Sequence, residues 1–101
     1  MSENYFCDMS ALTPAQRQRH QALALQLRPL LVEIIELPNG YELRLNSDLD
    51  NTVAEFCELE SLCCPFFTLI PSSHGGNSKL SVTGEGDIKP FIRSEFGLPE
   101  V

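Results

Sequence analysis

The chain has 101 residues, which suits one domain and not two, and its 43% hydrophobic content allows an ordinary core without disulfide bonds. With 14 acidic and 7 basic residues the net charge is -7, and no segment concentrates lysine or arginine, which argues against nucleic-acid binding. The sequence has no apolar run near the ~20 residues that span a bilayer and no signal-peptide pattern, so we expect a cytoplasmic protein without a membrane segment.

The first predicted helix has a well-defined start. Thr13 suits the N-cap, Pro14 the first helical position, and Gln16 completes a capping box. Pro29 cannot continue a helix, so we expect this one to end near residue 28. The residues before it, 1–10, are expected to be a flexible start of a single domain over residues 1–101.

A β-hairpin is predicted next. Residues 30–37 are rich in branched apolar side chains, residues 41–45 alternate apolar and polar, and Pro38-Asn39-Gly40 lies between them. We expect Gly40 to take the left-handed conformation in the turn. The first strand is apolar on both faces, so either helices cover both faces of the sheet or one apolar face forms a homodimer.

A second helix and a buried strand follow the hairpin. Ser47 or Asp48 can cap a helix over residues 49–63, and Pro65 limits its continuation. Residues 66–70, apolar except for Thr68, are typical of a buried strand.

The remainder of the chain repeats this order of elements. Residues 72–78 are polar and rich in glycine and serine, which predicts a hairpin loop, and residues 79–83 alternate as a strand. A last helix is expected over residues 87–96, with Gly97 as its terminating residue. The order α-ββα-ββα predicts an α+β fold with one four-stranded, mostly antiparallel sheet packed with helices.

Four cysteines are the chemically informative residues, and in a cytoplasmic protein we expect thiols and not disulfides. Cys63 and Cys64 are adjacent at a helix end, where two sulfurs suit a soft cation such as Zn, Cu or Hg. Cys7 or Cys57 would be the third ligand, although Cys57 also suits the core. Redox chemistry and simple burial of small apolar side chains remain alternatives for the Cys63–Cys64 pair.

Glu60 breaks the apolar pattern of the second helix. At about 100° per residue it falls near the centre of the apolar face. The other members of this face are Leu49, Val53, Phe56, Cys57, Cys63 and Cys64. A buried carboxylate needs a partner, and Arg19 or His20 on the first helix can provide one. Glu60 would then support the thiols, form a purely architectural ion pair, or lie at a wet margin if the register is off by one residue.

One segment resembles a known group of proteins. Glu60-x-x-Cys63-Cys64-Pro65-Phe66-Phe67 is similar to a motif of a family of small bacterial proteins, loosely associated with heavy-metal resistance gene neighbourhoods. The resemblance extends to Cys7-Asp8, to the Leu-Thr-Pro start of the first helix, to Gly40-Tyr41 and to Thr83-Gly84. It implies soft-metal handling and no particular reaction.

Three functions are consistent with these residues. The first is a non-enzymatic accessory protein that binds a soft metal or a thiol through Cys63, Cys64 and Cys7, with Glu60 supported by Arg19 or His20. The second is a small protein-interaction module with structural cysteines, and the third a thiol-dependent enzyme. Converging sulfurs would favour metal binding, and separated buried sulfurs would favour the interaction module. One exposed sulfur beside a base would favour the thiol-dependent enzyme.

Overall fold

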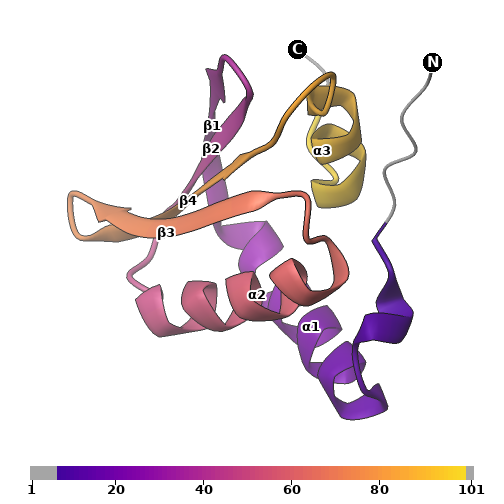
Figure 1. Ribbon diagram of the computed structural model, residues 1–101. Coiled ribbons are helices and arrows are strands. Elements are labelled where there is room, and N and C mark those ends of the chain that lie inside the picture. Colours follow the sequence, from indigo (N-terminus) through magenta and orange to yellow (C-terminus); the bar gives the residue numbers. More distant parts are fainter. Residues whose placement is uncertain (1–6, 100–101) are drawn as a thin grey trace.

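The computed structural model describes residues 7–99 and has the element order α-ββα-ββα (Figure 1), which confirms the α+β class. Its elements are η1 (Met9–Ala11), α1 (Pro14–Leu27), η2 (Arg28–Leu30), β1 (Leu31–Leu37), β2 (Gly40–Leu45), α2 (Asp50–Cys63), β3 (Thr68–His74), β4 (Asn77–Thr83) and α3 (Lys89–Phe96), where η marks a short 3-10 helix. None of the helices among residues 7–99 combines the length and apolar character needed to cross a membrane.

The four strands form one antiparallel sheet in the order β1-β2-β4-β3. Because successive side chains of a strand point to opposite faces, β2 and β4 each bury every second residue. The buried side chains of this inner face are Tyr41, Leu43, Leu45, Leu80 and Val82. Residues from α1, α2 and α3 surround this face, so the core lies between it and the three helices.

The outer face of the sheet carries an ion-pair network. Arg44 Nε lies 2.7 Å from Glu42 Oε2 and its Nη1 lies 3.3 Å from Glu33 Oε1, while Lys79 Nζ lies 3.4 Å from Glu42 Oε1. Charged side chains therefore occupy the face opposite to the helices, and the alternative in which helices cover both faces is wrong. The homodimer through an apolar sheet face stays a prediction.

Gly40 is required for a different reason than expected. Its φ is not positive, so the expected left-handed conformation is wrong. A Cβ at this position would instead overlap the carbonyl group of Val82 and lie 2.7 Å from Cα of Thr83. The absence of a side chain therefore lets β2 approach β4 closely.

The second hairpin is longer than the sequence indicates. β3 continues to His74 and β4 begins at Asn77, so only Gly75 and Gly76 remain as the turn, with φ of 61° and 86°. Two consecutive positive φ angles are typical of a type I′ turn, whose twist matches that of the strands. The predicted loop over residues 72–78 is therefore wrong, because the polar residues of this exposed edge pair as strand.

The start of α1, the end of α2 at Cys63 and the end of α3 are as predicted, and only the cap at the start of α2 differs. The capping box of α1 is confirmed, since Gln16 N donates to Thr13 Oγ1 at 3.1 Å and Thr13 N to Gln16 Oε1 at 2.9 Å. Gly97 ends α3 with φ 64°.

The cap of α2 comes from a distant part of the sequence. Neither Ser47 nor Asp48 caps this helix, and Leu49 at its N-cap contributes no side-chain hydrogen bond. Ser78, which is 1% exposed, instead accepts a hydrogen bond from Leu49 N at 2.8 Å and donates one to Asp50. β4 therefore fixes the start of α2 through a single buried hydroxyl.

Candidate thiol–carboxylate site

Glu60 lies in the core and has the partner that its position requires. The residue is 1% exposed, and its Oε1 lies 2.6 Å from His20 Nε2 on α1. The imidazole also stacks on Phe56 of α2, with ring centroids 5.3 Å apart. The prediction of a buried Glu60 that contacts Arg19 or His20 is thus confirmed through His20.

Arg19 does not belong to the site. Its Nε and Nη2 each lie 2.8 Å from a carboxylate oxygen of Glu55, and both side chains are largely exposed. Arg19 and His20 are adjacent on a helix and point about 100° apart, so only one of them can face Glu60. The supporting role expected for Arg19 is therefore wrong.

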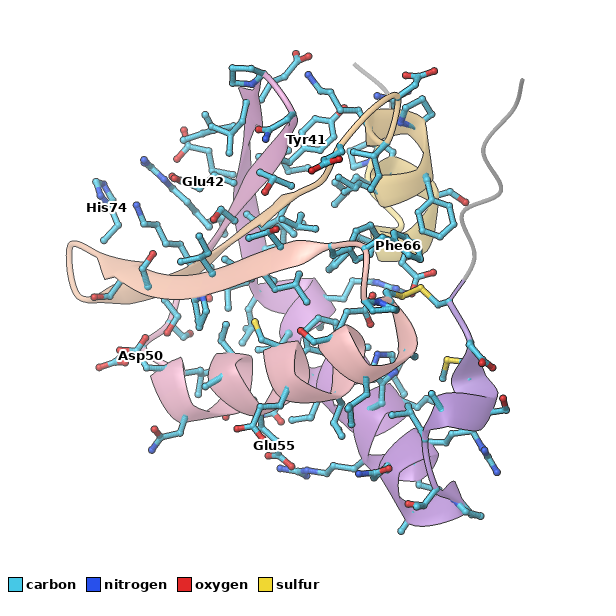
Figure 2. All side chains as sticks on the ribbon, in the orientation of Figure 1. Tyr41, Glu42, Asp50, Glu55, Phe66 and His74 are labelled. Atoms are coloured by element: carbon cyan, nitrogen blue, oxygen red, sulfur yellow. A yellow bond between two sulfur atoms is a disulfide. The ribbon has the colours of Figure 1, made fainter. Side chains whose placement is uncertain are left out.

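Cys7 and Cys64 form a disulfide bond, seen as a yellow bond near Phe66 in Figure 2. The expectation that all four cysteines are thiols is thus wrong for this pair, while Cys57 and Cys63 are free and buried. Asp8 N donates to Cys63 O at 2.8 Å, and this backbone hydrogen bond holds the neighbouring Cys7 beside the end of α2. A contact between residues 57 positions apart is not visible in local sequence patterns.

The three sulfurs of Cys7, Cys63 and Cys64 converge. All lie within 4.8 Å of one another, and Cys63 Sγ is 3.9 Å from Cys64 Sγ. Cys63 donates its thiol hydrogen to the carbonyl oxygen of Glu60 at 3.5 Å, and Cys64 Sγ lies 3.4 Å from Glu60 Oε2. The end of α2 therefore brings sulfur and carboxylate oxygen together.

A second carboxylate from α3, Glu95, completes the cluster. Its Oε2 lies 4.0 Å from Cys64 Sγ, and burial together with the charge of Glu60 raises the pKa of Glu95 to about 7. Sequence reasoning missed this residue. Its spacing of three from Ile92 and four from Phe91 places it on the inward side of α3, which was the available signal.

Burial determines the protonation of the free thiols. It raises the pKa of Cys63 to about 11, with a further contribution from the charge of Glu60, and raises that of Cys57 to about 12. Both thiols are therefore neutral at pH 7. Cys57 is 6% exposed among the apolar core residues, which confirms its assignment to the core.

Three overlapping groups of described residues have ligand atoms close enough for one metal ion. They are Cys7, Cys63 and Cys64; Cys7, Glu60, Cys64 and Glu95; and His20, Glu60 and Cys63. The first group is the set expected from the sequence.

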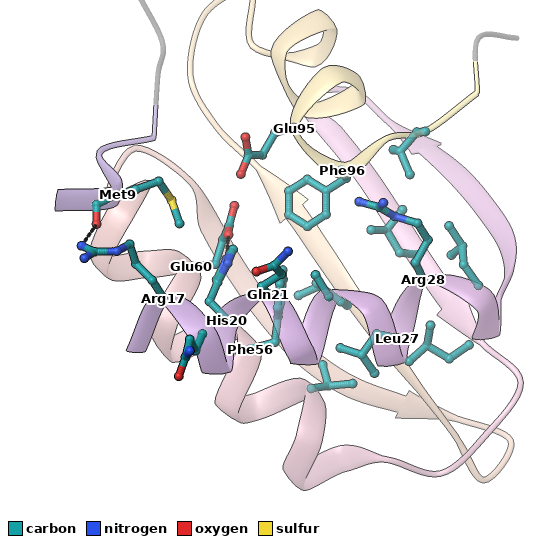
Figure 3. Close-up of a pocket in the computed structure, with 18 of the residues that line it drawn as sticks. Met9, Arg17, His20, Gln21, Leu27, Arg28, Phe56, Glu60, Glu95 and Phe96 are labelled. Carbon is teal, nitrogen blue, oxygen red and sulfur yellow. Dashed lines mark hydrogen bonds and ion pairs between the residues drawn. The ribbon is translucent and has the colours of Figure 1, made fainter. Parts of the chain in front are cut away.

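A cleft of about 830 Å³ opens next to this cluster, between α1, the inner face of the sheet and α3 (Figure 3). Most of its lining is apolar, from Leu43, Leu45 and Leu80 of the sheet to Phe56 and Phe96 of the helices. His20, Glu60 and Glu95 also line it, whereas none of the cysteines does. The cleft thus reaches the two carboxyl groups but not the sulfurs.

Comparison with protein-family models, with curated proteins and with solved structures gives no match for the chain. The resemblance of the Cys63-Cys64-Pro65 segment to a bacterial family therefore stays a prediction.

Proposed function

We propose that the protein, with Cys7 and Cys64 reduced, binds one soft metal cation through Cys7, Cys63 and Cys64. The observation that carries this proposal is the convergence of three sulfurs within 4.8 Å of one another at the end of α2. Soft thiolate ligands select Zn(II), Cu(I) or Hg(II) over hard cations such as Mg(II).

The sulfur spacing suits a metal ion. Two sulfurs bound to Zn at ~2.3 Å in a tetrahedral site lie about 3.8 Å apart. The distance between Cys63 Sγ and Cys64 Sγ is 3.9 Å, so this pair needs almost no rearrangement. Cleavage of the disulfide lets Cys7 Sγ move away from Cys64 Sγ to a similar distance.

Burial raises the pKa of Cys63 to about 11, so this thiol loses its proton only as the metal binds, whereas reduced Cys64 has a proton acceptor beside it. A thiol must give up its proton to bind a metal, and Cys64 Sγ already lies 3.4 Å from Glu60 Oε2. His20 holds the other oxygen of this carboxylate at 2.6 Å, which fixes its orientation. Glu60 therefore contacts a ligand sulfur and His20 orients Glu60, which are the roles of a second coordination shell.

The disulfide determines when the site is open. We place the protein in the cytoplasm, where the glutathione pool keeps most disulfides reduced. There Cys7 and Cys64 are thiols and can bind a metal. In an oxidising environment the same two sulfurs are bonded to each other and the site is closed.

The two rival functions have weaker support. A module with merely structural cysteines needs no convergence of three sulfurs from distant segments. A thiol-dependent enzyme needs an accessible nucleophile, whereas Cys63 and Cys64 are both 0% exposed.

Metal titration tests the proposal. The protein is reduced with a phosphine, exchanged into oxygen-free buffer and titrated with Zn(II) or Hg(II), with binding followed by native mass spectrometry and by thiolate-to-metal absorption. We expect one ion per chain in the wild type and a loss of affinity of at least about 100-fold in the double variant Cys63→Ser/Cys64→Ser.

Cys57→Ala is the matched control, because Cys57 is a buried free cysteine outside the three groups of possible ligands. It should bind the metal as tightly as the wild type. Equal affinity in the wild type and in the double variant would remove the cysteine pair from any metal site.

A further inference from the structure

The cleft beside the cluster has the size and the walls of a small-molecule site. Such sites usually measure about 300–1,000 Å³ and are mainly apolar with a few polar groups. This cleft measures about 830 Å³ and is lined on the sheet side by Leu43, Leu45 and Leu80. These side chains belong to the core, so an apolar molecule held in the cleft would contact the edge of the core.

The polar groups of the cleft define the charge that fits it. Glu60 and Glu95 supply two carboxyl groups against one imidazole, that of His20. Figure 3 shows these three side chains in the middle of the cleft, with Arg17 toward one end and Arg28 toward the other.

Both arginines have partners of their own. Arg17 Nη1 donates to the carbonyl oxygens of Leu12 at 2.8 Å and Met9 at 3.3 Å. The guanidinium of Arg28 lies beside Gly97, at the carboxyl end of α3, where helix carbonyls favour a cation. The two guanidinium groups thus lie toward the ends of the cleft, and its acidic groups, Glu60 and Glu95, lie at its middle, where a positive group would fit.

Aromatic rings strengthen this preference. Phe56 and Phe96 both line the cleft, and their ring centroids lie 6.1 Å apart in an edge-to-face arrangement. Phe96 directly follows Glu95 in α3. An ammonium group near these carboxylates would also be attracted to the faces of the rings.

We propose that this cleft binds a hydrophobic alkylammonium ion, with its amine at Glu95, next to the buried Glu60, and its hydrocarbon chain along the inner face of the sheet. None of the cysteines lines the cleft, so the bound amine would not contact the sulfur ligands of the metal site.

Three probes of equal length test the charge preference. Octylammonium, 1-octanol and octanoate are titrated into the full chain at pH 7 by calorimetry, below the concentrations at which they aggregate. We expect octylammonium to bind at least about 10-fold more tightly than 1-octanol, since its charged amine forms stronger hydrogen bonds to a carboxylate than a hydroxyl group does. Octanoate should bind most weakly.

Variants test the position. Glu95→Gln should lower the affinity for octylammonium by about 10-fold and leave that for 1-octanol unchanged, and Ala24→Phe should fill the cleft and weaken all three probes. Glu58→Gln is the matched control, because Glu58 is exposed on α2 and does not line the cleft. Folding of each variant is checked by circular dichroism, and Glu95→Gln alone suffices if Ala24→Phe does not fold.

The outcomes are decisive in both directions. Equal binding of the three probes, tighter binding of octanoate, or no binding of any of them would overturn the proposal. Cys63→Ser should not alter octylammonium binding, so failure of the metal site and failure of this site are distinguishable.

Discussion

At the scale of single residues, the His20–Glu60 pair is the contact on which the site depends. Glu60 is 1% exposed, and its Oε1 lies 2.6 Å from His20 Nε2. Removal of one partner leaves a carboxyl group buried without its donor, which costs more than the net value of the intact contact.

We therefore expect His20→Ala to lower the free energy of unfolding by about 2–4 kcal/mol, as measured by urea denaturation at pH 7. His20→Gln keeps an amide donor near Glu60 and should lose only about half as much. The neighbouring Arg19→Ala removes an exposed pair and should have little effect. A His20→Ala variant as stable as the wild type would contradict the importance of this contact.

Helical periodicity explains both why the sequence identified Glu60 as a site residue and why it missed Glu95. Helical periodicity places a residue on the inward side of its own helix, and for α2 this was enough to identify Glu60 and a partner on α1. Periodicity does not say which helices pack against each other on a sheet face, so it could not bring Glu95 of α3 beside Cys64. The disulfide between Cys7 and Cys64 was unpredictable on the same grounds.

At the scale of elements, the cap of α2 shows how one strand determines the start of a helix. Ser78 on β4 accepts from Leu49 N at 2.8 Å, in place of the local caps expected from the sequence. Loss of a capping hydroxyl usually costs about 1–2 kcal/mol.

Ser78→Ala should therefore destabilise the protein by about 1–2 kcal/mol in urea denaturation, with earlier amide hydrogen exchange in the first turn of α2. Ser81→Ala is the control, because Ser81 lies on the same strand toward the outer face of the sheet. The cap is unimportant if the two variants are equally stable.

The ion pairs of the outer sheet face predict a pH dependence. Hydrogen bonding to Arg44, with the charge of Lys79 nearby, lowers the pKa of Glu42. A carboxyl group with a lowered folded-state pKa stabilises the protein above its unfolded pKa of about 4.3, and loses this contribution as the pH falls through the folded value.

Glu42→Gln should therefore lower the melting temperature by about 2–5 °C at pH 7. The difference between variant and wild type should shrink below pH 4.3 and vanish below the folded-state pKa of Glu42, where this carboxyl group is protonated in both states. Melting curves from pH 2 to 8 measure this, and a difference that is constant with pH would exclude an electrostatic origin.

At the scale of the whole molecule, the sequence pattern was sufficient for the fold class and insufficient for the sheet edges. Pro14, Gly97 and the Pro38-Asn39 turn mark boundaries by local stereochemistry, and those boundaries were correct. The Ser72–His74 segment is polar and resembles a loop, yet it pairs with β4 because the Gly75-Gly76 turn directs it back along that strand.

The disulfide contributes to global stability as well as to the site. It joins residues 57 positions apart, and closure of a loop of that length is worth about 4 kcal/mol in the chain-entropy account. Reduction should therefore lower the free energy of unfolding by about 4 kcal/mol, as measured by urea titration with and without a phosphine.

Cys7→Ser should be as stable as the reduced wild type, and a phosphine should not change it. If reduction leaves the wild type as stable as before, the bond between Cys7 and Cys64 does not contribute to its stability.

The same bond sets the route by which tension crosses the molecule. A pull on the two ends of the oxidised chain enters at Cys7 and leaves at Cys64, so the segment with α1, β1, β2 and α2 carries no load along its backbone. The load falls on β3, β4 and α3, and β4 is held between β2 and β3 in the sheet. Mechanical extension of the oxidised protein would thus peel β4 away from β2, while the segment between Cys7 and Cys64 would not lengthen. In the reduced protein the whole chain would lengthen.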